Sequence, residues 1–271
     1  MTYQGGRADP HPRATSVKRS QRMLAILERL AESGSLSLES LSAELAVSPA
    51  TIRRDLADLE DQQLLRRTHG GAKTFDTAIE LPVQLKDTRF REAKALIARR
   101  AAQLIPSGRY VVALSGGTTT TEVARVLATR RELTIVTNSL TTATQLASRP
   151  TLQVIMTGGL VRPHSFELVG VLAENTFNAI NVGTAILGVD GITAAAGATT
   201  HDEVEARTNH AMVTHAQRTV VVADGSKVGR VTLASVATCD QVHDLVTDST
   251  ADPAALEELR DAGVRVHVAD A

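Results

Sequence analysis

The chain has 271 residues, which is long for one ordinary domain and suits two. Apolar residues make up 43% and charged residues 22%, as in an ordinary globular protein. The formal net charge of −1 excludes a polycation, so any affinity for nucleic acid would have to come from a local patch. Tryptophan is absent and aromatic residues are only 2%, which disfavours recognition by base stacking.

Cysteine, membrane and metal signals are also weak. Cys239 is the single cysteine, which excludes an internal disulfide and a multi-cysteine zinc site. No apolar run approaches the ~18 residues of a membrane span, and residues 1–16 lack the apolar core of a signal peptide. His201, His210 and His215 are spaced so that they do not share one helical face, so we expect no metal site. The sequence predicts a soluble, cytoplasmic protein with no cofactor and no membrane partner.

The amino-terminal part begins with a segment that has little to bury. Residues 1–16 contain glycine, proline and arginine, so we expect a disordered tail whose Arg7 and Arg13 lie near a phosphate backbone. Apolar residues then recur at helical spacing over residues 17–33. Leucines at helical spacing mark a second, short helix over residues 38–45.

A tight turn leads into a third helix, predicted from Pro49 to about Asp61. Ser48 can cap this helix by accepting a hydrogen bond from the backbone N–H of Thr51, and proline is tolerated at the first helical position. One face carries the apolar residues Ile52, Leu56 and Leu59. The opposite face carries small side chains and two cations, namely Ala50, Thr51 and Arg54, with Arg53 at its edge.

Such a helix fits the second helix of a helix-turn-helix, whose amino-terminal turns enter the major groove of DNA. A guanidinium group matches the O6 and N7 acceptors of guanine or a pair of phosphate oxygens. The alternative is a solvated face on which the two arginines pair with Asp55, Asp58 or Glu60. The order of two helices, a turn, a capped helix and a basic hairpin favours DNA binding.

The basic hairpin follows the third helix directly. Leu64 to Thr68 reads as a short strand closed by Gly70 and Gly71, and His69 lies at the turn. It would form a wing whose Arg66 and Arg67 hold the DNA backbone or the minor groove. We therefore expect a winged helix-turn-helix domain over residues 17–72.

Residues 19–72 closely resemble the winged helix-turn-helix of the DeoR family of bacterial sugar-metabolism repressors. The segments VS-x-x-TIRRDL, LL-x-R and HGGA carry this resemblance. Gln63 departs from the pattern, since the family usually has glycine before the wing. The resemblance implies that operator DNA is contacted by Ser48, Thr51, Arg53, Arg54, Arg66 and His69.

The pattern changes after residue 85. Residues 73–85 carry few regular signals and are expected to be a linker, and a helix is predicted over residues 92–104. Beyond it, short apolar strands alternate with amphipathic helices, which predicts an open, mostly parallel α/β sheet covered on both faces over residues 86–271. The predicted strands span residues 110–114, 133–137, 152–156, 184–188, 219–223 and 244–248.

A turn rich in glycine and threonine follows the first of these strands, in SGGTTTTEVARVL (115–127). Free backbone N–H groups at the start of a helix favour an anion, and Thr118, Thr119 and Thr120 add hydroxyl donors. The turn lacks the Walker and GxGxxG patterns. The alternative is that these residues serve only to turn the chain.

Other loops at the carboxyl ends of the strands supply further candidate ligands. In an open parallel sheet, ligands bind at these ends, so Asn138, Arg162, Asp190 and Lys227 are expected to approach the turn. A Gly/Thr cradle with two cations suits a phosphorylated sugar. The alternatives are a surface salt bridge for Arg162 and a solvated turn for Lys227.

Residues 80–268 resemble the effector domain of the DeoR family through EAKALIA, GGTTT, LTIVTNS, TGG, ELVG, LGVDGI and DGSKVGR. The resemblance implies the fold of the sugar-phosphate isomerases and binding of a phosphosugar without turnover. Departures at Ser115, Gly183, Thr184 and Asn209, where the family often has charged residues, imply a less charged pocket. The effector site implied by the resemblance comprises Gly117, Thr118, Thr119, Asn138, Gly158, Gly159, Asp190 and Lys227.

Two functions are compatible with these features. One is a repressor of a carbohydrate operon that binds double-stranded operator DNA as a dimer or tetramer and responds to a phosphorylated sugar. The other is a sugar-phosphate isomerase with a DNA-binding head, which would need a positioned carboxylate to move a proton. Asp190 is followed by Gly191 and Ile192 instead of further acids, and Glu203 and Glu205 are expected on a helix surface. The sequence therefore favours a regulator that is not an enzyme.

Overall fold

The computed structural model describes residues 12–74, 80–87 and 89–270. The chain forms two compact units, the first ending at Arg89 and the second beginning at Phe90. Each unit has its own apolar core.

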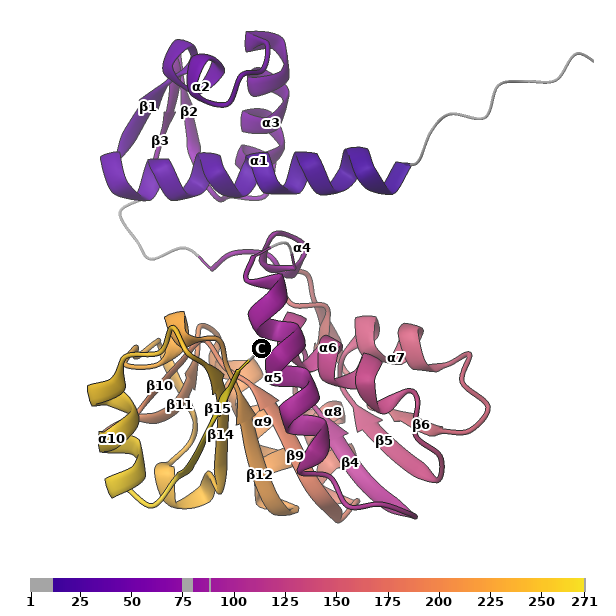
Figure 1. The fold of residues 1–271 in the computed structure, drawn as a ribbon. Helices are drawn as coiled ribbons and strands as arrows, with labels where there is room; N and C mark the ends of the chain where they lie inside the picture. Colours follow the sequence, from indigo (N-terminus) through magenta and orange to yellow (C-terminus); the bar gives the residue numbers. More distant parts are fainter. Residues whose placement is uncertain (1–11, 75–79, 88, 271) are drawn as a thin grey trace, which may run out of the picture. The chain divides into compact units, whose positions relative to one another are not determined.

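The first unit is a winged helix-turn-helix (Figure 1). Its three-stranded antiparallel sheet has the strand order β1-β3-β2. The core contains the apolar faces of all three helices, including Ile26, Leu41, Ile52 and Leu59, all of them fully buried. The elements are α1 (Pro12–Ser33), β1 (Ser35–Ser37), α2 (Leu38–Glu44), α3 (Pro49–Asp61), β2 (Arg66–Thr68) and β3 (Gly71–Lys73).

Two expectations about the ends of this unit differ from the structure. Helix α1 begins at Pro12 and includes Arg13, so the expected disordered tail is wrong for residues 12–16; residues 1–11, with Arg7, lie outside the described residues. The expected linker at 73–85 begins with the last residue of β3 and ends within a short helix, α4 (Val83–Lys86). Residues 75–79 lie outside the described residues.

The second unit contains a seven-stranded parallel sheet with the order β15-β14-β12-β9-β4-β5-β6. The expected strands are present, and β15 is an additional one. Two smaller antiparallel sheets were not expected. One pairs β7 (Leu160–Arg162) with β8 (Glu167–Val169), and the other consists of β10 (Gly191–Thr193), β11 (Gly197–Thr200) and β13 (Ala234–Ala237). The sheet consists of β4 (Tyr110–Leu114), β5 (Leu133–Thr137), β6 (Gln153–Met156), β9 (Val182–Gly188), β12 (Ala216–Val222), β14 (Asp244–Asp248) and β15 (Arg265–Ala269).

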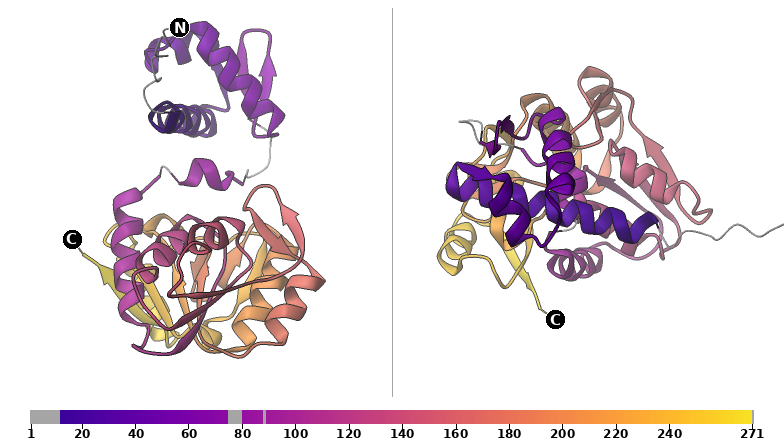
Figure 2. Two further views of the ribbon diagram at one scale, coloured as in Figure 1. Left: turned by 90° about the vertical axis from the view of Figure 1, so that its right-hand side faces the viewer. Right: turned by 90° about the horizontal axis from the view of Figure 1, so that it is seen from above.

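Helices cover both faces of this sheet, as expected from its apolar strands (Figures 1 and 2). Buried residues of α5 (Arg91–Gln103), α6 (Thr118–Leu127) and α7 (Leu140–Leu146) belong to one core cluster. Buried residues of α8 (Val171–Asn178), α9 (Glu203–Thr214) and α10 (Pro253–Asp261) belong to the other. The second cluster also includes residues of β10 (Gly191–Thr193), β11 (Gly197–Thr200) and β13 (Ala234–Ala237).

A buried carboxylate ties three neighbouring strands together at their amino ends. Asp244, at the start of β14, accepts hydrogen bonds from Arg218 Nε (2.7 Å), Arg265 Nε (3.1 Å) and His267 Nε2 (2.8 Å). Burial alone would raise the pKa of Asp244, but these hydrogen bonds outweigh it and hold the pKa well below its ordinary range. Because this end of the sheet lies opposite the carboxyl ends of the strands, we assign the cluster a role in stability.

Candidate functional site

Helix α3 forms as its sequence predicts. Ser48 is the N-cap, and its Oγ accepts a hydrogen bond from the N–H of Thr51 (3.3 Å) and contacts the Thr51 hydroxyl (3.0 Å). Proline occupies the first turn. Ile52, Leu56 and Leu59 are buried, as expected, so the helix is fixed on one side and exposed on the other.

The acids beside the paired arginines are held by other cations. The buried carboxylate of Asp55 accepts from Arg22 Nε (2.5 Å) and Nη2 (3.1 Å) on α1. Arg19, also on α1, forms ion pairs with Asp55 and Asp58. Glu60 pairs with Arg67 of the wing, and hydrogen bonds from the backbone and side chain of Arg67 lower its pKa.

Arg53 and Arg54 are therefore left as exposed cations. Both side chains are exposed, and neither forms an ion pair within the part of the chain that the structure describes. The solvated ion-pair alternative from the sequence is not what the structure shows. The first turns of α3 present two guanidinium groups to a ligand from outside this unit.

Of the two arginines of the wing, Arg66 is exposed in the same way and Arg67 is engaged by an acid of α3. Arg66 and His69 are exposed, and Arg66 forms no ion pair with a described residue. Arg67 donates to Glu60 through its backbone N–H (2.8 Å) and its Nε (2.6 Å). Arg67 therefore fixes the wing against α3, a use that the sequence did not reveal.

Two backbone positions shape the wing. A Cβ at Gly71 would lie 1.9 Å from the carbonyl oxygen of Leu36, so only glycine allows β1 and β3 to pair at this point. Gln63, the residue that departs from the family pattern, has a left-handed φ of 57°. A glycine would adopt that conformation without steric cost.

In the second unit, candidate residues gather where the strand order reverses. β4 pairs with β5 on one side and with β9 on the other, so the carboxyl ends of β4 and β9 border the crevice in which open α/β sheets bind ligands. The carboxyl ends of these two strands are in contact, because the Gly188 N–H at the end of β9 donates to Ser115 Oγ just after β4 (3.0 Å). A Cβ at Gly188 would come within 3.0 Å of the carbonyl oxygen of Gly116.

The Gly/Thr turn forms an open helix start. Gly117 is the N-cap of α6 with a φ of 111°, and no side chain caps the helix. Thr118 and Thr119 are each 8% exposed, and neither hydroxyl has a hydrogen-bond partner among the described residues. Thr120 differs, since its hydroxyl donates to the carbonyl oxygen of Gly116 (2.7 Å). An anion at this helix start could use backbone N–H groups, the helix dipole and two hydroxyl groups.

A buried carboxylate lies directly against this turn. Glu167, 2% exposed, accepts a hydrogen bond from Gly116 N–H (2.7 Å), and its side chain fills the space that a Cβ at Gly116 would need. The amides of Asn138 and Asn209 also donate to it, at 3.4 and 3.5 Å, and Asn138 donates to Asn209 Oδ1 (3.2 Å). Glu167 lies in β8 (Glu167–Val169), which pairs with β7 (Leu160–Arg162).

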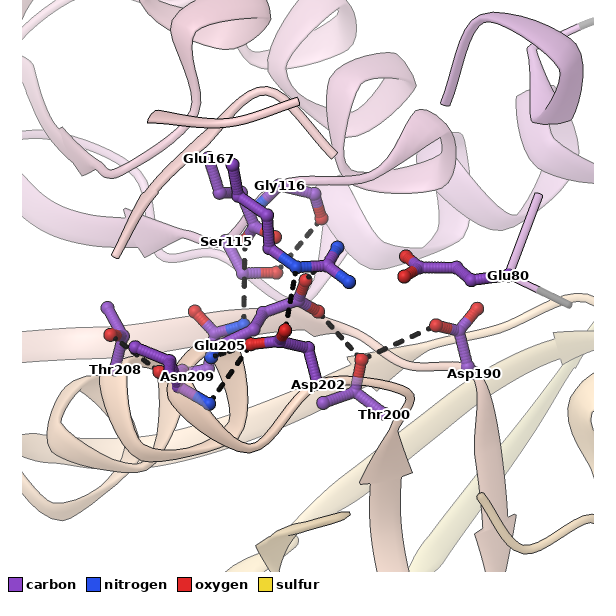
Figure 3. A network of polar contacts seen from close by, with 12 residues as sticks. Glu80, Ser115, Gly116, Glu167, Asp190, Thr200, Asp202, Glu205, Thr208 and Asn209 are labelled. Atoms are coloured by element: carbon purple, nitrogen blue, oxygen red, sulfur yellow. Dashed lines mark hydrogen bonds and ion pairs between the residues drawn. The ribbon is translucent and has the colours of Figure 1, made fainter. Parts of the chain in front are cut away.

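The remaining candidates form a chain of polar contacts. Arg162 donates to Glu205 (Nη1–Oε2, 3.0 Å) and pairs with Asp202 (Nε–Oδ2, 3.2 Å). Thr200 donates to Glu205 Oε1 (2.7 Å) and contacts Asp190 Oδ2 (3.4 Å), as Figure 3 shows. Lys227, in the turn after β12, donates to Asp190 Oδ1 (3.1 Å). Both expected cations are thus held by carboxylates.

The electrostatics of this network are dominated by its acids. Burial, followed by the charge of nearby Glu167, raises the pKa of Glu205 well above its ordinary value, although Arg162 and Thr200 oppose the shift. Burial also acts to raise the pKa of Asp202, but the Glu205 N–H and the charge of Arg162 outweigh it and lower the pKa. The site therefore holds one carboxyl group, that of Glu205, whose pKa burial raises well above its ordinary value.

The structure brings together many of the expected effector-site residues but not all. Arg162, Asp190 and Lys227 lie in one chain of polar contacts. Asn138 contacts Glu167, which accepts from the Gly116 N–H beside the helix start at Gly117. Gly158 and Gly159 do not, because their nearest neighbours are Leu172 and Val169. They lie at the base of the β7-β8 hairpin, outside the polar contacts.

The sequence missed the acids at the centre. The expectation that Glu205 lies on a helix surface is wrong, since the side chain is buried and only Glu203 is exposed. The surface salt bridge considered for Arg162 is also wrong, because the Arg162–Glu205 ion pair is largely buried. Glu167 carried a signal that could have been used, because it is a lone acid flanked by Phe166 and Leu168.

The histidines do not form a metal centre in the described part of the chain, where no group of three potential ligands gathers. His210 Nδ1 contacts the carbonyl oxygen of Val236 (2.8 Å), and His215 Nδ1 contacts that of Ala211 (3.1 Å). These contacts fit a structural role.

The fold and its two sites define a class of protein: a winged helix-turn-helix joined to an α/β domain with a polar, helix-start site at the switch point of its sheet. Residues 22–78 match the model of the DeoR-like helix-turn-helix domain, and residues 89–249 match that of the DeoR C-terminal sensor domain. The chain belongs to the DeoR family of transcriptional regulators, as the motifs predicted.

Full-length relatives support the same class. The transcriptional regulator GlpR of Haloferax volcanii is 38% identical over 248 residues, covering 91% of this chain and 96% of the relative. The glycerol-3-phosphate regulon repressor of Escherichia coli is 30% identical over 252 residues, covering 93% of this chain and all of the relative. Both are named as regulators and not as enzymes, which agrees with the expected regulatory role.

The chain is also similar to solved isomerases, at a distance. Ribose 5-phosphate isomerase A of Neisseria gonorrhoeae is 15% identical with a TM-score of 0.37, covering 55% of each chain. This likeness carries no conclusion about activity. Among the described helices, none has both the length and the apolar character needed to cross a membrane.

Proposed function

We propose that this protein is a repressor of a carbohydrate operon that binds double-stranded operator DNA through α3 and the wing and responds to a phosphorylated sugar or polyol bound in its second unit. The base-reading and phosphate-binding roles fall to Ser48, Thr51, Arg53, Arg54, Arg66 and His69. Arg67 supports DNA binding by holding the wing on Glu60.

One observation carries the DNA-binding half of this proposal. The acids that could neutralise the paired arginines are engaged by Arg19, Arg22 and Arg67, while Arg53 and Arg54 are exposed and without an ion pair in the described residues. Desolvating a guanidinium group against guanine or phosphate then requires no existing ion pair to be broken. Helix-turn-helix proteins use this part of the helix to contact bases.

Operator affinity of an Arg54→Ala variant tests this half. Fluorescence anisotropy with a labelled fragment of the upstream chromosomal region should show a loss of roughly 1–3 kcal/mol if Arg54 reads a base. Arg149→Ala removes the same charge from an exposed position in the second unit and should bind as the wild type does. Equal affinities for the two variants would remove Arg54 from the interface.

The effector half rests on the open start of α6. Backbone N–H groups of its first turn and the hydroxyls of Thr118 and Thr119 suit a phosphate group. Asn138 Oδ1 is buried without a donor among the described residues, and an effector hydroxyl would satisfy it. Carboxylates accept hydrogen bonds from further hydroxyls, so the network around Asp190 and Glu205 suits a polyhydroxylated ligand.

The phosphate position can be tested with compounds of known structure. Thermal-shift and calorimetric titrations of the full chain would compare glycerol 3-phosphate and a panel of sugar phosphates with their unphosphorylated forms. Glycerol 3-phosphate is included because it appears in the name of a relative. Thr119→Val should lose the response, whereas Thr141→Val, an exposed threonine on α7, should keep it. Responses of equal size for both would place the phosphate elsewhere.

Regulation requires that the effector favour one arrangement of the protein. The chain would act as a dimer or tetramer whose heads read repeated or inverted half-sites. An effector can release the operator only through a higher affinity for the form that does not bind DNA. Lys227→Ala should therefore keep operator binding while weakening the effector response.

A further inference from the structure

An exposed apolar surface lies beside the effector site. Of the nine large apolar side chains that the described residues expose, six lie in one region, formed by β6, the β7-β8 hairpin and the start of α8. Leu160 is 76% exposed, and Val171 and Leu172 are each 65% exposed. We name the apolar edge surface by these six residues: Ile155, Met156, Leu160, Val161, Val171 and Leu172.

The segments that carry these six residues lie next to one another. A Cβ at Gly158 would touch Leu172 Cβ at 3.6 Å, which places the turn after β6 against the start of α8. Leu160 pairs with Val169 in the hairpin, two residues before Val171. Contiguous exposed apolar surface of this kind marks an interaction site in a soluble protein.

The two edges of the large sheet differ in how they are protected. The β15 edge carries Arg265 and His267, and charged or polar side chains on an edge strand discourage another strand from pairing. β6 forms the opposite edge with the sequence QVIM, which has no charge and exposes Ile155 and Met156. The β6 edge therefore lacks the usual protection and is suited to being covered.

The charge pattern indicates what covers it. No ionisable residue occurs in the segments 150–161 and 168–173. A neutral apolar surface has no cations to bind DNA and no charges to select a different protein. Two identical copies, by contrast, can meet there across a two-fold axis without bringing like charges together. Depletion of charge at the centre is typical of homodimer interfaces.

We propose that a second copy of this chain covers the apolar edge surface, with the β6 strands of the two copies facing each other across a two-fold axis. The β7-β8 hairpin links this interface to the site. Its outer residues Leu160 and Val161 belong to the surface, while Arg162 holds Glu205 and Glu167 holds the Gly116 N–H. Moving either side chain on effector binding would shift the hairpin and with it the interface; this link rests on the proposed effector site.

Sedimentation of the purified full chain tests the interface without DNA or effector. The wild type should be a dimer or larger at micromolar concentration, and Leu160→Asp and Val171→Glu should each weaken the assembly by at least roughly tenfold. Leu233→Asp is the matched control, because Leu233 is 80% exposed and lies outside the surface. A monomeric wild type, an unchanged Leu160→Asp assembly or dissociation by Leu233→Asp would overturn the proposal.

Hydrogen exchange on the unmodified protein removes any concern that a variant misfolds. The segment 150–161 should be more protected at high protein concentration than after dilution, whereas the segment around Leu233 should not change. Protection that is independent of concentration would contradict the proposal and would indicate another part of the same chain as the cover. Failure of operator binding with normal sedimentation would refute the proposed function and leave the interface standing.

Discussion

Replacing Asp55 by asparagine tests the ion-pair arrangement on which the DNA interface depends. The carboxylate is 1% exposed, its partner Arg22 is 18% exposed, and Arg19 contacts it from the same helix. Breaking a buried ion pair costs about 3–5 kcal/mol. Arg22 keeps some contact with water and asparagine keeps one acceptor, so we expect a loss of roughly 2–3 kcal/mol, at or below the lower end of that range.

Calorimetric unfolding of the full chain measures this loss. For a domain of the size of the first unit, roughly 2–3 kcal/mol lowers the melting temperature by about 8–24 °C, and the second unit should melt unchanged. Asp61→Asn is the control, since Asp61 is exposed on the same helix and has no ion pair among the described residues. If the first unit melted at the same temperature in both variants, Asp55 would not anchor α3. The explanation of why Arg53 and Arg54 have no ion pair would then be wrong.

Three further predictions concern stability. The pKa of Asp244 is depressed in the folded state, so its contribution is present above the unfolded pKa of about 3.9 and is lost as the pH falls below it; Asp244→Asn should flatten this acid limb in urea titrations. The pKa of Glu205 is raised in the folded state, so the free energy of unfolding should fall as the pH rises above about 4.3 towards the folded pKa. Glu205→Gln should remove that fall. The same dependence of stability on pH in the variant and the wild type would contradict the burial of this carboxyl group. Gln63→Gly should raise stability by up to roughly 1 kcal/mol in chemical denaturation, because relief of the left-handed conformation outweighs the added freedom of the unfolded chain; a loss would show that the φ of 57° carries no strain.

Local patterns predicted the parts of the fold that depend on neighbouring residues. The cap at Ser48, the proline after it and the buried face of α3 follow from spacing alone, because capping and helical periodicity act within a few residues. Apolar strands were found for the same reason. β15 was not predicted because its sequence, RVHVA, alternates polar and apolar residues, as is expected of an edge strand. Its His267 contacts Asp244 on the neighbouring strand.

The centre of the proposed effector site could not be predicted in this way. Whether a carboxylate on α9 points outward or inward depends on what packs against the helix, and Glu205 is drawn inward by Arg162 from a hairpin more than forty residues away. Glu167 likewise owes its position to the N–H of Gly116, across a loop contact. Long-range partners of this kind leave no periodic signal in the sequence.

The central claim is that α3 and the wing bind duplex DNA. Footprinting of the chain's own upstream chromosomal region at low salt measures this directly, with a variant in which Arg53 and Arg54 are both alanine as the comparison. We expect the wild type to protect an operator, with protection that weakens steeply as salt rises, and the folded variant to give no protection. Equal protection by both proteins, or none by the wild type, would contradict it.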